Sequence, residues 1–290
     1  MKITFSPRIA VVVAAAIFLH LNATATPATV NLGTASSFSI LAYSEITDAG
    51  GASTIAGNVG LSPTTGTFIG LTTGQVGGTI YAVNASGPAG VTGNNPGLLT
   101  TAKDDLSAAF TDAANRPVPG ANAFGVVDNQ LGGRTLFPGV YSFGHAATAN
   151  LIGTLTLDAN GETDPVWIFQ ASSDLITASG SKVALINGAT SCDVFWQVGS
   201  SATLGTSTAF VGNIMALASV GLDTGATLDG SALAENAAVT LDHNTITHED
   251  CSANGSPNGG GVPDTGSTLL LLGSGLAALL AFRQRFFSPA

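Results

Sequence analysis

The chain has little charge, and cations are especially scarce. Only 9% of its 290 residues are charged, against roughly 25% in an average soluble protein. Four of the eight Lys and Arg residues lie near the two ends, which leaves Lys103, Arg116, Arg134 and Lys182 between them. Nucleic acids and anionic membrane surfaces are bound by clustered cations. We therefore expect no nucleic acid as a partner.

The sequence also lacks the motifs of common catalytic sites. It has no H-E-x-x-H, G-x-S-x-G or P-loop pattern, and none of the three later histidines, His145, His243 and His248, lies in a triad-like context. Asp223, Asp229 and Asp242 recur with the period of the repeats in this part of the chain, which a calcium-binding or lyase solenoid could use. Their place at strand ends favours turn formation instead. We expect no enzyme activity, no cofactor and no metal.

Residues 1–25 have the composition of a secretory signal peptide. Lys2 and Arg8 provide a basic start, residues 9–21 are mostly apolar, and Ala23-Thr24-Ala25 has the small-residue cleavage pattern. An uncleaved membrane anchor is the alternative, although the apolar core is short for a span. The sequence predicts export.

The other end has three parts after the flexible linker 252–261. Val262-Pro263-Asp264-Thr265-Gly266 precedes an apolar run over 267–282, and Arg283 and Arg285 follow it. The run is about long enough to cross a bilayer, and the cations favour a cytoplasmic end. This order resembles the bacterial PEP-CTERM sorting signals, in particular the V-P-D-S/T-G variant, which in those families is cut by an exosortase-type membrane protease. A plain tail anchor is the alternative. We predict a sorting signal with a transmembrane segment over 262–290, in a secreted or cell-surface protein anchored in the membrane through this segment.

The chain has two cysteines, Cys192 and Cys251. In an exported protein such a pair can form a disulfide. Two free thiols are the alternative. A metal site with His248, Glu249 and Asp250 is a third, but its spacing matches no standard zinc pattern.

A repeat of 18 or 19 residues runs through the second half of the chain. Apolar residues recur at Leu204, Leu222 and Leu241, and again at Phe210, Leu228 and Ile246. Three short strands per repeat, with Gly or Asp at the corners, are what one coil of a β-solenoid requires. A β-sandwich with a fortuitous period is the alternative. Units of the same kind occur near the N-terminus, at 45–48, 53–57 and 78–81.

One clear helix separates these two sets of repeats. Asn95 precedes Pro96 at the first helical position, and the helix ends at Arg116-Pro117. One face is apolar at helical spacing, through Leu99, Ala102, Leu106, Ala109, Phe110 and Ala113. This stripe predicts a helix that packs along one side of the solenoid.

The stretch 30–247 resembles the ice-binding-like family of microbial ice-binding and antifreeze proteins. The segments that carry the resemblance include 30–35 (VNLGTA), 131–136 (LGGRTL), 153–158 (GTLTLD), 167–170 (WIFQ), 195–200 (FWQVGS) and 212–216 (GNIMA). The resemblance implies a mostly β fold over 26–251: a discontinuous right-handed β-solenoid with three-faced coils and a long helix alongside. It also implies that one flat face binds ice.

An ice-binding face needs small hydroxyl and methyl groups at the strand spacing of roughly 4.8 Å, and threonine holds both groups rigidly. Thr54, Thr227 and Thr245 are expected in one outward column, with Thr206, Thr208, Thr224 and Thr247 beside it, and Thr224-Gly225-Ala226-Thr227 resembles the T-A/G-x-T/N pattern of some family members. Threonine is also simply a good exposed strand residue. Lys182, at the equivalent place in an earlier coil, is expected to mark the edge of the face. The leading hypothesis is an antifreeze protein whose partner is an ice surface. A surface adhesin or matrix module without ice affinity is the alternative.

Overall fold

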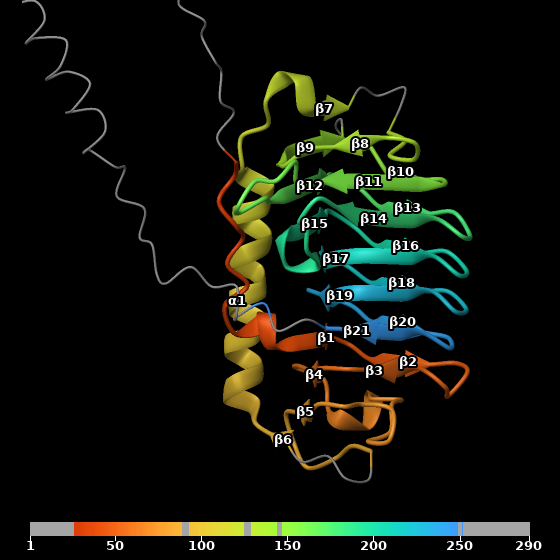
Figure 1. Cartoon of the computed structure of the whole chain (residues 1–290). Helices are drawn as coiled ribbons and strands as arrows, with labels where there is room; N and C mark the ends of the chain where they lie inside the picture. Colours follow the sequence, from red (N-terminus) through yellow and green to blue (C-terminus); the bar gives the residue numbers. More distant parts are fainter. Residues whose placement is uncertain (1–25, 89–92, 125–128, 144–146, 249–250, 252–290) are drawn as a thin grey trace, which may run out of the picture.

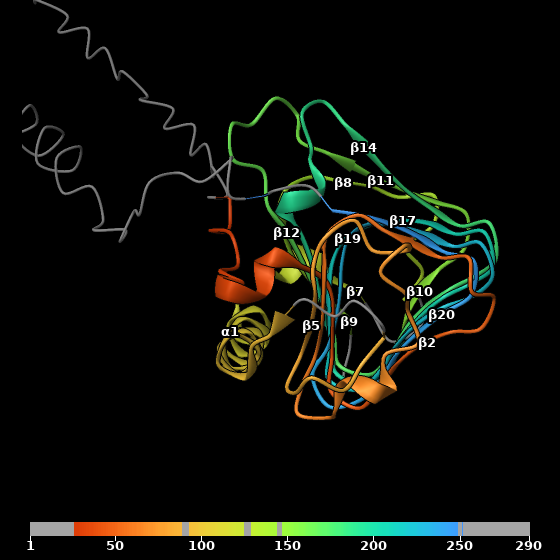
Figure 2. The same ribbon diagram turned by 90° about the horizontal axis from the view of Figure 1, so that it is seen from below.

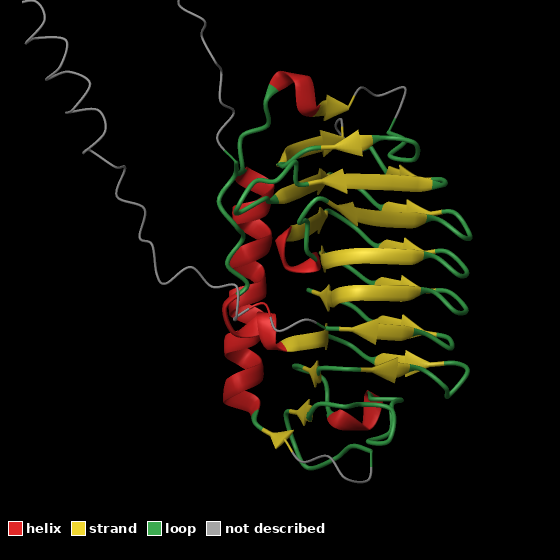
Figure 3. Cartoon of the chain, viewed as in Figure 1, coloured by secondary structure: helices red, strands yellow, loops and turns green. Residues whose placement is uncertain are grey.

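Short parallel β-strands stack in coils beside one long helix (Figures 1 and 3). The computed structural model describes residues 26–88, 93–124, 129–143, 147–248 and 251. Seen along the stack, the coils form a tube with three sides, and the helix α1 (Pro96–Asn115) runs outside one of them (Figure 2). The predicted mostly β solenoid with one long helix is confirmed.

The side next to α1 is here named the helix face. Its order along the stack is β6 (Gly93–Asn94), β5 (Ile80–Ala82), β4 (Asn58–Leu61), β1 (Phe38–Ala42), the second halves of β19 (Thr227–Ala234) and β17 (Ala209–Ala216), β15 (Val194–Val198), β12 (Trp167–Ala171), β9 (Gly139–Phe143) and β7 (Ala123–Phe124). Four short 3-10 turns accompany the strands: η1 (Gly33–Ser37), η2 (Gly66–Phe68), η3 (Gly120–Asn122) and η4 (Ser191–Asp193).

The other two sides are named the short-strand face and the threonine face. The short-strand face is a sheet of three-residue strands in the order β10 (Ala149–Leu151), β13 (Leu175–Thr177), β16 (Ala202–Leu204), β18 (Val220–Leu222), β20 (Val239–Leu241) and β2 (Ile46–Asp48). The threonine face contains β8 (Thr135–Leu136), β11 (Thr154–Asp158), β14 (Lys182–Ile186), the first halves of β17 and β19, β21 (Thr245–Thr247) and β3 (Thr54–Ile55).

The solenoid is discontinuous in sequence, as the resemblance implied. The N-terminal strands form the coils at one end of the stack, and α1 then carries the chain along the stack to the opposite end (Figure 1). From there the later coils return, until β19, β20 and β21 pair in parallel with β1, β2 and β3. The predicted repeat is also in register, because Leu204 pairs with Leu222 and Phe210 with Leu228.

A row of neighbouring aromatic rings fills part of the solenoid interior. The ring centroids of Tyr141 and Phe169 are 5.4 Å apart, and those of Phe169 and Trp196 are 4.0 Å apart. The ring centroid of Phe210 lies 4.8 Å from that of Trp196. The Trp196 indole also donates a hydrogen bond of 2.9 Å to the carbonyl of Val211, which joins the helix face to the threonine face. The row buries large apolar surfaces and keeps the indole N–H satisfied.

The helix α1 covers the helix face through the predicted apolar stripe. Leu99, Ala102, Leu106, Ala109 and Ala113 are buried and form one cluster with outward residues of the face, among them Phe38, Ile168, Phe195 and Leu233. The Asn95 side chain caps the first turn by accepting from the Leu98 amide. At the other end, Gln170 donates to the carbonyls of Ala113 and Arg116.

Polar contacts also attach the middle of α1 to the solenoid. The Lys103 ammonium donates to the carbonyls of Ala234 and Glu235 at 2.7 Å each, and Ser107 donates to the Glu235 carboxylate. Burial lowers the pKa of Lys103 to about 8, against the opposing effect of Glu235. The helix is therefore held by directional bonds as well as by apolar packing, and the helix face is closed to solvent there.

Cys192 and Cys251 form a disulfide with a Cα–Cα distance of 5.4 Å. It attaches the end of the described chain to η4. The predicted signal peptide, linker and C-terminal sorting signal lie outside the described residues. Among the residues described, no helix is both long enough and apolar enough to cross a bilayer.

We expect Trp196→Ala to lower the free energy of unfolding by about 3–5 kcal/mol, because it removes the centre of the aromatic row and leaves a cavity. Urea denaturation measures this loss. Phe137→Ala is the matched control, since Phe137 is an aromatic residue with 52% of its surface exposed, and should change the stability by at most about 0.5 kcal/mol. Equal losses in the two variants would contradict the role of the row.

Candidate functional site

The threonine face presents a straight column of outward side chains, here named the outer column. Its residues pair directly from coil to coil, in the order Thr154, Lys182, Ala209, Thr227, Thr245 and Thr54. Parallel strands lie roughly 4.8 Å apart, so the column repeats at that spacing. Thr54 and Thr245 are neighbours although 191 residues separate them in sequence, because the late coils stack on the early ones. The predicted alignment of Thr54, Thr227 and Thr245 in one column is confirmed.

A recurring corner places four of these residues. Two positions before Lys182, Ala209, Thr227 and Thr245 stand Gly180, Ser207, Gly225 and His243, all with φ between 54° and 71°. This left-handed conformation turns the chain from the short-strand face into the threonine face. The next residue points inward, and the one after it points outward into the outer column. The four-residue unit Thr224-Gly225-Ala226-Thr227 is one copy of this corner.

A second column lies beside the first on the same face. Thr135, Thr156 and Ala184 pair in one part of it, and Val211, Asp229 and Thr247 in another. Thr247 is exposed, and its hydroxyl donates to the Asp229 carboxylate at 3.1 Å. Asp229 therefore places one charge within the second column and engages the hydroxyl of the neighbouring threonine.

Two of the expected threonines lie on the corner rather than on the flat strands. Thr206 and Thr224 are both exposed there. The Thr224 hydroxyl donates a hydrogen bond to the carboxylate of Asp242. This bond and the neighbouring His243 lower the pKa of Asp242 below its usual range. Asp242 thus marks the charged border of the threonine face.

The prediction that Thr208 lies on the outer surface is wrong. Only 1% of its surface is exposed, because it occupies the inward position of the corner. Its hydroxyl lies 2.9 Å from that of Thr177 and donates to the carbonyl of Ala178 at 3.1 Å. A direct contact between Thr208 and an external surface is excluded by this burial.

The prediction that Lys182 marks the edge of the face is wrong. It lies inside the outer column, between Thr154 and Ala209. The column continues beyond it, and Thr154, Thr156 and Thr135 belong to the same face. The alternating sequence Thr154-Leu155-Thr156-Leu157 carries the same signal as Thr245-Ile246-Thr247 and could have identified this extension.

The short-strand face is the other side without a helix among the described residues. Its outward column consists of Asn150, Ile176, Thr203, Gly221, Thr240 and Thr47. This column has no charge, but it mixes an isoleucine, an asparagine and a glycine with three threonines. Gly221 interrupts its threonines, whereas Thr227, Thr245 and Thr54 follow one another without a break in the outer column.

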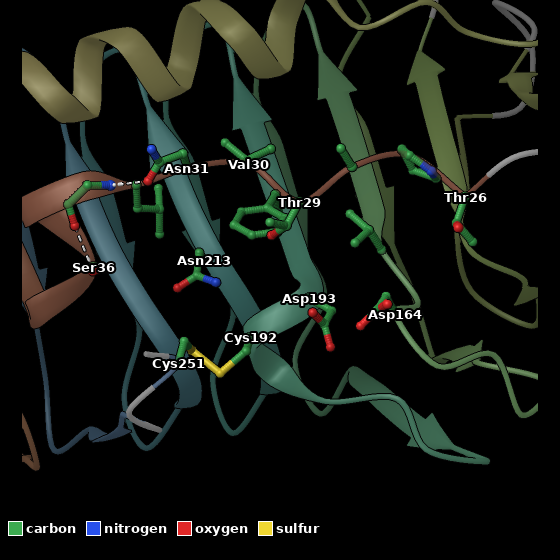
Figure 4. A pocket seen from close by; sticks show the side chains of 16 residues that line it. Thr26, Thr29, Val30, Asn31, Ser36, Asp164, Cys192, Asp193, Asn213 and Cys251 are labelled. Atoms are coloured by element: carbon green, nitrogen blue, oxygen red, sulfur yellow. Dashed lines mark hydrogen bonds between the residues drawn. A yellow bond between two sulfur atoms is a disulfide. The ribbon is translucent and has the colours of Figure 1, made fainter. Parts of the chain in front are cut away.

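A hollow of about 540 Å³ lies beneath the N-terminal segment 26–33, next to the disulfide (Figure 4). Asp164 and Asp193 line it together with Asn213 and the apolar Val166 and Phe195. Burial raises the pKa of Asp193, and the nearby Asp164 adds to the effect. In the part of the chain that the structure describes, no group of three or more His, Cys, Asp or Glu side chains is placed to hold a metal ion.

Comparison with known families matches two parts of the chain. The family described as Ice-binding-like matches residues 40–247, and the VPDSG-CTERM motif matches residues 261–286. An ice-binding protein of Nostoc sp. (strain HG1) is 41% identical over 257 residues, which cover 88% of this chain and 87% of the relative. One from Colwellia sp. is 40% identical and covers 76% of this chain and 84% of the relative.

Solved structures show the same fold. An ice-binding protein from an Antarctic biological consortium aligns with a TM-score of 0.68 and 34% identity, over 80% of this chain and 96% of the other. The ice-binding protein of the Antarctic ascomycete Antarctomyces psychrotrophicus aligns with a TM-score of 0.65 and 35% identity, over 77% and 99% of the two chains.

Proposed function

The chain belongs to the ice-binding-like family, and we propose that it binds ice through the threonine face and so inhibits ice growth or recrystallisation. The observation that supports this choice of face is the outer column, in which Ala209, Thr227, Thr245 and Thr54 stand in direct register on four successive coils. The alternative of an adhesin without ice affinity is not favoured, since relatives in several organisms are ice-binding proteins.

The chemistry of this column suits a solid water surface. Each threonine presents a methyl and a hydroxyl group with a restricted χ1, so little side-chain entropy is lost on binding. The strands that carry these side chains are fixed by backbone pairing on both sides. Charged groups would keep their hydration shells, and the charges of Lys182, Asp229 and Asp242 therefore limit the uncharged area.

The sorting motif indicates an extracellular or cell-surface protein. We further propose that residues 1–25 are removed on export, and that 252–261 link the solenoid to the sorting signal 262–290. The apolar run of the sorting signal would hold the protein in the membrane until an exosortase-type protease cuts at Val262-Pro263-Asp264-Thr265-Gly266. Ice bound by such a protein would be held at or near the cell surface.

Thr227→Tyr should abolish most of the thermal hysteresis and recrystallisation inhibition, because the bulky ring lifts the ice surface off its neighbours in the column. Thr240→Tyr is the matched control, since Thr240 is an exposed strand threonine on the short-strand face. It should keep the wild-type activity. Loss of activity in Thr240→Tyr alone would assign ice binding to the short-strand face instead.

Lys182→Thr should raise the ice activity above that of the wild type. The substitution removes the one cation within the outer column as described and joins Thr154 to the four uncharged positions beyond. Thermal hysteresis at equal protein concentration is the measurement. Ala108→Glu, at an exposed position on α1, is the control, because it also makes the net charge one unit more negative. Unchanged activity for Lys182→Thr would show that the ice surface does not extend to this coil, and a fall in activity would show that the lysine itself contributes to binding.

Intact-mass measurement of the protein recovered from the producing cells tests the proposed processing. We expect an N-terminus at Thr26 and a C-terminus within 262–266. A mass that still includes the chain to Ala290 would contradict cleavage at the motif and leave a membrane-anchored protein.

A further inference from the structure

Polar side chains occupy the inward position of several corners, where the interior is otherwise apolar. Ser181, Thr208 and Asn244 each directly precede a residue of the outer column, and each has only 1% of its surface exposed. Burying a hydroxyl or an amide is unfavourable unless its hydrogen bonds are made. Alanine serves at the same position in one coil, as Ala226, so the corner itself does not require a polar residue.

The side chains of these three residues bond to the preceding coil of the stack. Ser181 donates to the carbonyl of Leu151 at 2.9 Å. Thr208 donates to the carbonyl of Ala178 and contacts the Thr177 hydroxyl. In each case the partner lies at the end of a short strand, on the inner side of the corner.

Asn244 makes the largest number of these bonds. The side-chain NH2 group of Asn244 donates to the carbonyls of Asp223 and Ala226 at 2.8 and 2.9 Å. Its side-chain oxygen accepts from the backbone amide of Asp242 at 2.6 Å, and its backbone amide donates to the Ser53 hydroxyl at 2.9 Å. The residue thus connects the coil of Thr227, its own coil and the coil of Thr54.

The backbone carbonyls of the same three residues hold the outer column of the following coil. The carbonyl of Ser181 accepts from the Ala209 amide at 2.9 Å, that of Thr208 from Thr227 at 2.7 Å, and that of Asn244 from Thr54 at 2.8 Å. The side chain fixes the corner against one coil, and the carbonyl then fixes the column residue of the next.

We propose that Ser181, Thr208 and Asn244 are positioning residues for ice binding. They hold three members of the outer column, Ala209, Thr227 and Thr54, at a constant offset from the preceding coil. The backbone ladders fix which strand residues pair, and these directional side-chain hydrogen bonds add a defined contact at the corner, where the chain turns between two strands. This inference rests on the proposed function of the threonine face. It gives Thr208, which cannot touch ice, a part in presenting Thr227.

The test compares two substitutions at one site in the full-length protein. Thr208→Val removes the hydroxyl and keeps the shape, and Thr208→Ser keeps the hydroxyl. Asn244→Ala is a second variant, and Leu106→Ala, at the interface of α1 with the helix face, is a destabilised control remote from the column. Thermal hysteresis, the ice planes bound and the unfolding temperature of the protein are measured for each variant. Thr227→Tyr is measured in parallel.

We expect Thr208→Val to lose ice activity and to alter the ice planes bound, beyond any loss in Leu106→Ala, even where Leu106→Ala has the lower unfolding temperature. Thr208→Ser should retain the wild-type planes. If Thr208→Val and Leu106→Ala behave alike while Thr227→Tyr is inactive, the positioning role is refuted and the ice face stands. If Thr227→Tyr is fully active, the proposed face fails and the positioning role fails with it. Should Asn244→Ala not fold, the Thr208 pair decides.

Discussion

In-register parallel pairing between successive coils is the constraint on which the rest of the structure depends. A three-residue strand has too few hydrogen bonds to be stable alone, so each coil exists only because its neighbours supply partners. The same pairing carries β21 onto β3 and β20 onto β2, which closes the gap between the late and early parts of the chain. The column of threonines is a direct product of this pairing, since residues at one register position must stand in line.

The interior and the helix determine which surface is left to bind a ligand. Aromatic rings fill the tube beside the threonine face, and the Trp196 indole attaches that face to the helix face. The helix α1 covers one side completely enough to bury Leu99 and Leu106. Both remaining sides have a continuous register, and the threonine face carries the longer uninterrupted run of threonines, Thr227, Thr245 and Thr54.

Much of the fold could be predicted from the sequence because its signals are periodic. The spacing of Leu204, Leu222 and Leu241 predicted the coils, and Asn95-Pro96 predicted the start of the helix. The alignment of Thr54 with Thr227 and Thr245 followed from matching the early units to the late ones. Each of these signals lies within a strand or helix, where the direction of a side chain follows from the residue count.

The corners could not be predicted in the same way. Thr206 and Thr208 alternate as outward strand residues would, but Ser207 between them has a positive φ of 57°, which turns Thr208 inward. The position of Lys182 was misjudged for a related reason, since the continuation of the column to Thr154 depends on a pairing between coils. Sequence spacing gives the order of residues along a coil, whereas the face that each residue joins is set at the turns.

Incorporation of the protein into slowly growing ice, measured for tyrosine substitutions made one at a time along both uncovered faces, tests the central claim most directly. The account predicts that substitutions at Ala209, Thr245 and Thr54 exclude the protein from the ice, while those at Thr203 and Thr47 on the short-strand face leave it in the ice fraction. Incorporation that is lost only along the short-strand face would contradict it.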